Sequence, residues 1–346
     1  MVLLESAAVI GYGSIGRYHA RLLNQRYKRF AIIESQALAL ANAKADFPDA
    51  QVVDSLAALQ STGWNWASCL SVIATWGPSH APLFAELIEL GAKHVLCEKP
   101  LANSIALGDR MVKLAKRHGI TLGSHQHPQY SGFVDGLSKV AEQLQIGQPV
   151  RMVVNGGANG IVTNGLSYLA IACELFGEGP NQVISTVVPV AMNPRSTTLM
   201  FYGGTAIWSF QQDRELVVSF SNRASISATT YIFYRNAVVH MFPSLNVEIY
   251  RRDPKEVSEY PAVTRTGPAT ELAFGGSIPG VRAIEQSTSM IFDEIESGAI
   301  KVFPPELALR ALDGCIGAIY SGESKSAVTL PIDPSSEIGQ RQWPIS

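Results

Sequence analysis

Short apolar runs alternate with amphipathic stretches along the first third of the chain. Residues 7–10, 69–75 and 94–97 are mostly hydrophobic and are followed by glycine, tryptophan or charged positions. Short continuous runs of this kind are typical of buried parallel strands, and the longer stretches between them have helical length. The alternation predicts a doubly wound parallel sheet, in which ligands bind at the carboxyl ends of the strands.

From about residue 149 the pattern changes to apolar and polar residues in alternation. Such alternation is typical of antiparallel strands with one covered face. We expect strands at 150–154, 182–190, 197–201, 205–211, 216–221, 225–234, 237–241 and 247–251. We expect helices at 168–176, 283–296 and 306–320, and a long loop or irregular edge at 253–279.

These two patterns predict an α/β protein of two domains, as its length of 346 residues also favours. Residues 1–123 are expected to form a domain with this doubly wound sheet, a Rossmann domain. Residues 124–346 are expected to form an α+β domain with a large, mostly antiparallel open sheet.

A G-x-G-x-x-G motif follows the first apolar run, at Gly11, Gly13 and Gly16. Between a strand and a helix, the first glycine permits a tight turn, the second lets the backbone approach a pyrophosphate, and the third lets the helix pack closely. Backbone N–H groups at the helix start, at Ser14 and Ile15, would hold the phosphate charge. Alone, the motif also fits an ordinary glycine turn.

Glu34 ends the second apolar run, 23 residues after Gly11. A carboxylate about 20 residues beyond the motif binds the adenosine ribose diol in dinucleotide-binding folds. Glu34 would repel a 2′-phosphate, so the sequence favours NAD over NADP. The alternative is a surface glutamate at a strand end.

Composition excludes several partners and compartments. The net charge of −2 provides no basic field for nucleic acid or an anionic membrane. The four cysteines lack C-x-x-C spacing, which favours buried thiols in a reducing compartment over disulfides or zinc. No leader pattern or apolar run of membrane-spanning length is present in the sequence, so we expect a cytoplasmic protein.

Three motifs in order carry a resemblance to a known family: Gly11-x-Gly13-x-x-Gly16, Ala74-Thr75 with His80, and Glu98-Lys99-Pro100. With them the chain resembles the Gfo/Idh/MocA oxidoreductases, which include glucose-fructose oxidoreductase and inositol dehydrogenases. Later features, among them Gly147 and the helix end at Gly177, extend the resemblance over almost the whole chain.

The resemblance implies roles for particular residues. Lys99 would lie beside the nicotinamide and a substrate hydroxyl, where its ammonium stabilises a developing alkoxide. Glu98 would orient nearby groups or bind the cofactor ribose, and Pro100 would follow a cis peptide bond. The cofactor-binding residues implied at these two strand ends are Thr75, Trp76, His80, Glu98, Lys99 and Pro100; for His80 a helix-start role is the alternative.

The family's acid/base signature is altered in this chain. Counting back from Gly177, Ser167 falls on the family histidine and Ala170 on the downstream aspartate. An unaided serine cannot accept a proton as imidazole does. Substitute acceptors are Tyr168, Tyr130, His125 and His127, among which Tyr168 and His127 are our choice. We expect substrate to contact Lys99, His125, Asn164 and Ser167.

Three functions remain open at this stage. The first is hydride transfer between NAD and a secondary hydroxyl of a sugar, sugar derivative or cyclitol. The second is a regulatory protein that binds NAD and sugar without catalysis. The third is an enzyme that oxidises its substrate transiently to assist elimination or epimerisation. We expect no metal, since His125 and His127 lack a third ligand of suitable spacing, and we expect a homodimer or homotetramer through the C-terminal sheet.

Overall fold

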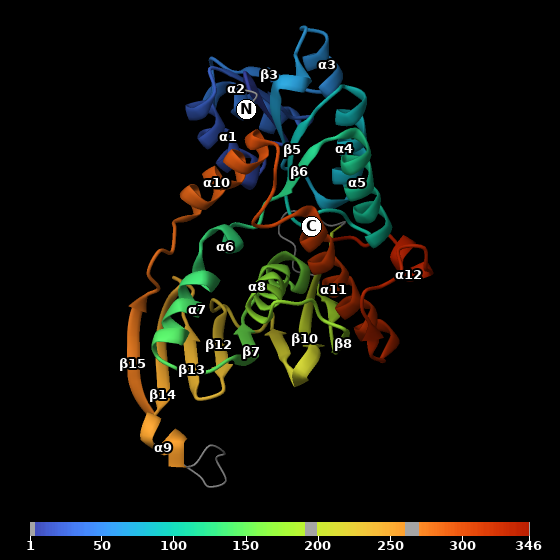
Figure 1. Ribbon diagram of the computed structural model, residues 1–346. Coiled ribbons are helices and arrows are strands. Elements are labelled where there is room, and N and C mark those ends of the chain that lie inside the picture. Colours follow the sequence, from blue (N-terminus) through green and yellow to red (C-terminus); the bar gives the residue numbers. More distant parts are fainter. Residues whose placement is uncertain (1–3, 191–198, 260–269, 346) are drawn as a thin grey trace. The chain divides into compact units, whose positions relative to one another are not determined.

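The computed structural model describes residues 4–190, 199–259 and 270–345, which form two compact units (Figure 1). The first unit comprises the described residues up to Tyr130, Ala283–Leu312 and those from Asp333 onward. The second comprises the described residues of Ser131–Arg282 and Asp313–Ile332. The boundary that we predict between residues 123 and 124 stays a prediction.

A six-stranded parallel sheet forms the first unit, in the order β3-β2-β1-β4-β5-β6. Its strands are β1 Ser6–Ile10, β2 Arg29–Ile33, β3 Gln51–Val53, β4 Cys69–Ile73, β5 His94–Cys97 and β6 Thr121–Ser124. The central strands β1 and β4 are buried along their whole length, which explains their continuous apolar runs. Chain order reverses between β1 and β4, where a doubly wound sheet binds its ligands.

The helices of the first unit connect these strands or return to them from the end of the chain. They are α1 Ser14–Arg26, α2 Ala37–Asp46, α3 Leu56–Gln60, α4 Gly77–Glu89, α5 Ile105–His118, α6 His127–Tyr130, α10 Ile284–Ser297 and α12 Glu337–Gln340, with the 3₁₀ turn η1 Trp66–Ser68. The predicted Rossmann sheet is therefore confirmed.

A ten-stranded mixed sheet forms the second unit, in the order β15-β14-β13-β12-β7-β11-β10-β8-β16, with β9 paired to β10. Its strands are β7 Pro149–Gly156, β8 Gln182–Ser185, β9 Val188–Val190, β10 Phe201–Ser209, β11 Glu215–Phe220, β12 Thr229–Tyr234, β13 Ala237–Met241, β14 Asn246–Arg252, β15 Thr270–Ser277 and β16 Val328–Thr329. Among the described strand pairs of this second sheet, only β7–β11 is parallel. The predicted large, mostly antiparallel sheet is confirmed.

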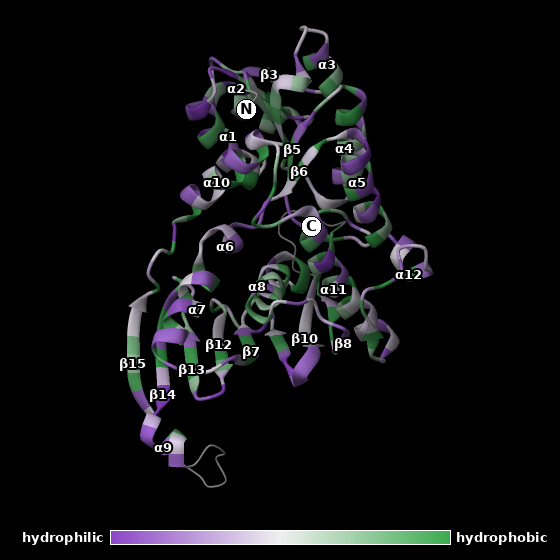
Figure 2. Cartoon of the chain, viewed as in Figure 1, coloured by the Kyte–Doolittle hydropathy of each residue, from purple (hydrophilic) through white to green (hydrophobic). Residues whose placement is uncertain are grey.

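Helices accompany this sheet: α7 Phe133–Gln143, α8 Leu166–Phe176, α9 Pro254–Glu259 and α11 Pro305–Ser324, with the π-helix η2 Ile161–Gly165 and the 3₁₀ turn η3 Gln211–Asp213. Residues of α11 up to Leu312 belong to the first unit. Helix α8 is hydrophobic along most of its length (Figure 2), and six of its residues are buried. None of the described helices is both long and apolar enough to cross a membrane.

Several sequence-based expectations differ from the structure. Strand β10 includes parts of the two strands expected at 197–201 and 205–211, and helix α7 was not expected. The strand expected at 182–190 is divided into β8 and β9. The hydroxyl oxygen of Ser185 accepts the N–H of Val187, and the strand is interrupted at this point. Residues 253–279 contain helix α9 and strand β15, which forms one edge of the sheet. Most of β15 is exposed, so it lacks the alternation that reveals a half-buried strand. Residues 197–198 of one expected strand lie outside the described residues.

Candidate functional site

The glycine loop links β1 to α1, and two of its glycines are required by close backbone contacts. Gly11 has φ +97°, and a Cβ there would lie 2.8 Å from the carbonyl oxygen of Ala74. A Cβ on Gly16 would lie 1.9 Å from the carbonyl oxygen of Gly11. Around Gly13, by contrast, a Cβ would meet no protein atom within 4 Å. The loop therefore leaves open space beside Gly13, as a pyrophosphate would need.

Ser14 and Ile15 begin helix α1 directly after this open position, and both are exposed. Their location fits the predicted contact between cofactor phosphate and the first N–H groups of the helix, which stays a prediction.

Glu34 lies at the carboxyl end of β2 and is fixed by two backbone donors. Its Oε2 accepts the N–H of Tyr12 at 2.7 Å, and its Oε1 accepts the N–H of Gln36 at 2.7 Å. A carboxylate has about four acceptor positions, so two remain for the hydroxyls of a ribose. The residues present thus fit an adenosine ribose beside the glycine loop.

Tyr12, the second residue of the glycine loop, was not predicted as a site residue. Its hydroxyl donates to Asp46 Oδ2 at 2.7 Å, and its ring packs edge-on against Phe47. Burial and the neighbouring Asp46 raise the pKa of Tyr12 to about 12. The ring therefore anchors the loop on the end of α2, while the backbone N–H orients Glu34.

Replacing Glu34 with alanine should raise the Kd for NAD about tenfold or more, because each hydrogen bond from a hydroxyl to a carboxylate contributes about 1.5–3 kcal/mol. The Kd for NADP should stay the same or fall, since the repulsive charge is removed. Calorimetric titration with both cofactors measures the change. Asp54→Ala, at an exposed acid just after the neighbouring strand β3, is the control and should bind NAD normally. Unchanged NAD affinity in Glu34→Ala would mean that the ribose is held elsewhere.

His80 joins the loops that follow β4 and β5. The imidazole is fully buried, with Nδ1 2.9 Å from the carbonyl oxygen of Pro100 and Nε2 3.2 Å from that of Thr75. Burial lowers the pKa of His80, so the ring is neutral near pH 7 and carries one N–H. The Lys99–Pro100 peptide bond is cis, as the resemblance implies. Trp76, beside Thr75, is 49% exposed and free to line a binding site.

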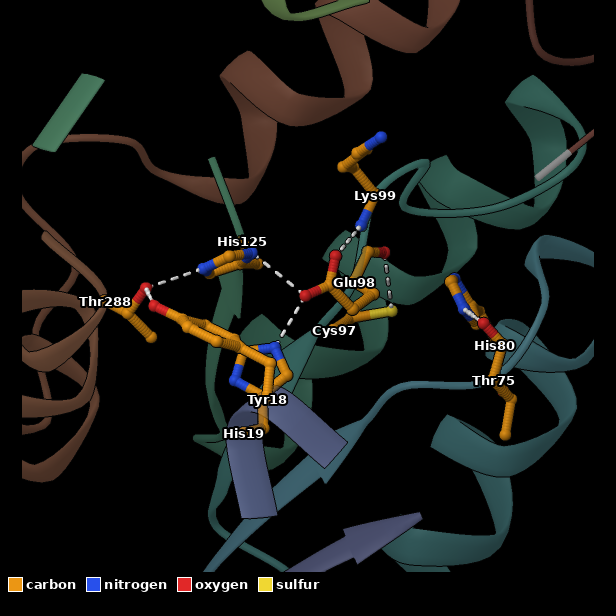
Figure 3. A network of polar contacts seen from close by, with 9 residues as sticks. All are labelled: Tyr18, His19, Thr75, His80, Cys97, Glu98, Lys99, His125 and Thr288. Atoms are coloured by element: carbon orange, nitrogen blue, oxygen red, sulfur yellow. Dashed lines mark hydrogen bonds and ion pairs between the residues drawn. The ribbon is translucent and has the colours of Figure 1, made fainter. Parts of the chain in front are cut away.

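Glu98 follows β5 and is the centre of a buried cluster (Figure 3). Its Oε1 lies 2.6 Å from His19 Nε2 and 2.9 Å from His125 Nδ1, while its Oε2 accepts the backbone N–H of Lys99 at 3.3 Å. Burial alone would raise the pKa of Glu98, but His125 and His19 outweigh it and hold that pKa well below its usual range. Glu98 is therefore a buried carboxylate that fixes the backbone of Lys99.

The cluster continues to helix α10. His125 Nε2 lies 3.0 Å from Thr288 Oγ1, which lies 2.9 Å from the hydroxyl oxygen of Tyr18. Both ring nitrogens of His125 thus have partners within the first unit, and its predicted contact with substrate stays a prediction. Sequence reasoning missed His19, Tyr18 and Thr288.

His19, Glu98 and His125 are also residue types that bind metals, and their donor atoms lie within 4.8 Å of one another. Sequence spacing does not indicate this grouping, because His19 and Glu98 are 79 residues apart. The contacts of 2.6 Å and 2.9 Å to Glu98 Oε1 are hydrogen-bond distances, so hydrogen bonding accounts for the cluster.

His127 and Tyr130 lie at the two ends of the short helix α6. Burial, together with His125 and Lys99, lowers the pKa of His127 to about 4. Tyr130 donates its hydroxyl to Glu294 Oε2 at 2.7 Å, and burial and that carboxylate raise its pKa. At neutral pH, His127 is therefore a neutral imidazole whose pKa is lowered in part by the charge of Lys99. Tyr130 is a protonated phenol whose hydroxyl is hydrogen-bonded to Glu294.

The remaining predicted residues belong to the second unit. Asn164 lies on the π-helix η2, and its Oδ1 accepts the N–H of Gly160 at 3.3 Å. Ser167 and Tyr168 are half-buried in the first turn of α8, whereas Ala170 is 3% exposed. Burial raises the pKa of Tyr168, which keeps its phenol protonated near pH 7.

The sequence and the fold of this chain are similar to those of known oxidoreductases. Residues 6–126 match the Gfo/Idh/MocA oxidoreductase profile, described as an NAD-binding Rossmann fold. Inositol 2-dehydrogenase of Acidiphilium cryptum is 34% identical over 115 residues, which are 32% of this chain and 33% of that protein. The chain thus aligns with only about a third of this curated relative.

Solved structures extend the likeness over nearly the whole chain. An oxidoreductase from Agrobacterium radiobacter, crystallised with NAD+, L-tartaric acid and magnesium, is 18% identical with a TM-score of 0.71, over 94% of this chain and 98% of that one. UDP-N-acetylglucosamine 3-dehydrogenase from Acidithiobacillus ferrooxidans is 16% identical with a TM-score of 0.67, over 92% and 98%. At these identities the likeness shows a shared fold. The profile match covers residues 6–126 and describes an NAD-binding Rossmann fold like that of the Gfo/Idh/MocA oxidoreductases.

Proposed function

We propose that the protein is an NAD-dependent oxidoreductase that transfers hydride to or from a secondary hydroxyl of a sugar, sugar derivative or cyclitol. The family match of residues 6–126 supports the cofactor and the reaction class. Two relatives are named as dehydrogenases of inositol and of UDP-N-acetylglucosamine, both of which carry polyhydroxylated rings. These names support the substrate class.

The observation that carries the proposal is the fixation of Lys99 at the carboxyl end of β5. Glu98 accepts the backbone N–H of Lys99, and His80 contacts the carbonyl oxygen of the following Pro100. A lysine fixed in this way can place its ammonium where negative charge develops on a substrate oxygen. NAD, when bound, supplies the hydride acceptor or donor, while the glycine loop holds its pyrophosphate and Glu34 its ribose.

Proton transfer falls to His127 in this proposal. A general base must hold a free lone pair near neutral pH, and the lowered pKa of His127 leaves its imidazole neutral. The raised pKa of Tyr168 makes its phenolate scarce, so it is the weaker choice. Asn164 and Ser167 are proposed to bind substrate hydroxyls together with Lys99 and His125.

Replacing His127 with asparagine should lower kcat for alcohol oxidation about a hundredfold, the usual contribution of a general base. Tyr168→Phe is the matched variant and should retain kcat within about threefold, because the phenol is protonated. In the unmodified enzyme, kcat/KM should fall only as pH approaches about 4, where His127 becomes protonated. A larger loss of kcat in Tyr168→Phe than in His127→Asn would mean that Tyr168, and not His127, is the general base.

Stopped-flow absorbance tests the function directly. The protein is mixed with NADH and a panel of ketosugars and oxidised cyclitols, and oxidation of NADH by any of them supports the proposal. If the protein binds NADH and sugar but no substrate in the panel oxidises NADH, the result would instead favour the regulatory alternative that Ser167 and Ala170 suggest. Product formation with no net change in NADH would favour elimination or epimerisation.

We also propose that the protein forms a homodimer or homotetramer through the sheet of the second unit. The support is a set of exposed apolar side chains on its strands: Val150, Ile184, Val188, Phe233 and Leu272. A cytoplasmic location stays a prediction from the sequence.

A further inference from the structure

Trp76 is exposed, although the other tryptophans of the chain are buried. Its side chain is 49% exposed, whereas Trp64, Trp66, Trp208 and Trp343 are 0–3% exposed. Burial of an indole removes a large apolar area from water, so an indole left half in water gives up part of that stabilisation. Packing of the fold therefore does not explain a tryptophan at this position.

The side chain of Trp76 does not cap a helix either. Trp76 is the N-cap residue of α4, and its side chain makes no capping hydrogen bond with any described residue. Serine, threonine, aspartate and asparagine are preferred at such a position, because their side chains accept a backbone N–H of the first turn. Departures from a local preference of this kind are expected at functional sites.

The backbone that carries the indole is held in place. The carbonyl oxygen of Trp76 accepts the backbone N–H of Ser79 at 2.9 Å, and that of Thr75 lies 3.2 Å from His80 Nε2. A Cβ on the next residue, Gly77, would lie 2.7 Å from a backbone carbonyl oxygen, so the chain is closely packed there. The exposed indole is thus attached to a fixed backbone and has only two side-chain torsions to lose on binding a ligand.

Lys99 follows the neighbouring strand at the same edge of the sheet. Strands β4 and β5 are adjacent and parallel, and the backbone N–H of Glu98 donates to the carbonyl oxygen of Ile73 at 2.9 Å. Trp76 and Lys99 come after these two residues, at the strand ends where a doubly wound sheet binds its ligands. The side chain of Lys99 points away from Glu98 (Figure 3).

We propose that Trp76 is a specificity-determining residue that stacks on the ring of the substrate and makes the protein prefer cyclic polyols to acyclic ones. This inference rests on the proposed function. The C–H groups of a pyranose or cyclitol form an apolar ring face, against which an indole packs, while an ammonium such as that of Lys99 donates to a ring hydroxyl. An acyclic polyol has the hydroxyls but no rigid apolar face, so only the second contact is open to it.

Titration of the protein loaded with NAD+ tests the proposal. The ring probes are inositol and the ring substrates found by stopped flow, and the acyclic probe is sorbitol. Trp76→Ala should raise the Kd for the ring probes about tenfold, the loss expected for one aromatic contact and the area that it buries. The Kd for sorbitol should stay within about threefold of that of the unmodified protein, because sorbitol lacks the stacked face.

Two further variants and the kinetics of oxidation separate stacking from a structural effect. Trp76→Phe keeps an aromatic face and should restore most of the affinity for the ring probes. Leu38→Ala, at another exposed apolar side chain of the first unit, is the control and should leave that affinity unchanged. In Trp76→Ala, KM should rise while kcat stays within about threefold, because stacking is the same in the ground state and the transition state.

The possible outcomes distinguish this proposal from the proposed function. Unchanged affinity for the ring probes in folded Trp76→Ala would overturn the proposal and leave the proposed function intact. An equal loss of affinity for NAD+, measured without sugar, would place the indole on the cofactor and would also overturn the proposal. Failure of the unmodified protein, with NAD+ bound, to bind any ring polyol would overturn the proposed function itself.

Fluorescence of the unmodified protein gives a test that needs no variant. Because four of the five tryptophans are buried, acrylamide in solution quenches chiefly Trp76. A saturating ring probe, added to the protein loaded with NAD+, should lower this quenching by about half, since a stacked ligand covers one of the two faces of the indole. Sorbitol should not lower it. Quenching that falls when NAD+ binds, and falls no further with a ring probe, would overturn the proposal.

Discussion

Replacing Lys99 with methionine should lower turnover by about a thousandfold, the upper range for removing one electrostatic contact to a developing charge. Methionine keeps an unbranched side chain and the backbone N–H that Glu98 accepts, so the local fold should persist. The affinity for NAD should change by less than about threefold, because an interaction made only in the transition state affects kcat rather than binding. Steady-state kinetics with the substrate found by stopped flow, combined with NAD titration, measures both quantities.

Lys93→Met is the control for this variant. Lys93 directly precedes β5, so it lies at the opposite end of the strand from Lys99, and its ammonium donates to the carbonyl oxygen of His118. Its replacement should leave turnover unchanged. Full residual activity in Lys99→Met would refute the assigned role, whereas loss of NAD binding together with turnover would indicate that Lys99 holds the cofactor instead.

Local patterns were sufficient to predict the parallel sheet of the first unit. Strand β5 was predicted at its observed bounds, His94–Cys97, because a strand buried on both faces needs a continuous apolar run. Strand β15 could not be predicted in the same way. It lies at a sheet edge with most of its residues exposed, and two adjacent glycines, Gly275 and Gly276, interrupt any alternation.

The candidate site divides along similar lines. The glycine loop and Glu34 are close in sequence, and their spacing reflects one strand–helix–strand unit, so the motif predicts their proximity. The partners of Glu98 are distant: His19 is 79 residues away, and His125 bonds to Thr288 across 163 residues. No local periodicity indicates that helix α10 supplies a partner for His125.

One signal for the cluster was nevertheless present in the sequence. His19 stands three residues after Gly16, on the helix that the motif predicts, and a histidine there is close to the carboxyl ends of the central strands. Tyr18, its neighbour, reaches Thr288. Ser167 and Ala170, by contrast, could be singled out from the sequence by counting back from Gly177. Their roles depend on a substrate and stay predictions.

Alanine at Gly13 and at Gly16 should have different effects, although both substitutions add one methyl group to the same loop. Gly16→Ala should destabilise the fold by about 1–3 kcal/mol or more, since its Cβ would lie 1.9 Å from the carbonyl oxygen of Gly11 and α1 would have to move. Gly13→Ala should keep or slightly raise the melting temperature, because its φ of −75° suits alanine and its Cβ meets no protein atom.

NAD binding should be weakened in both variants, and that combination separates the two causes. In Gly13→Ala the loss, expected to be about tenfold or more, would come from a methyl group in the space for the pyrophosphate, with the fold intact. Gly275→Ala, at another position where a Cβ meets no protein atom, controls for the substitution itself and should change neither quantity. Normal NAD affinity in Gly13→Ala would place the pyrophosphate away from Gly13. An unchanged melting temperature in Gly16→Ala would show that α1 can shift from Gly11 at little cost, and the third glycine would then be required by the cofactor rather than by the fold.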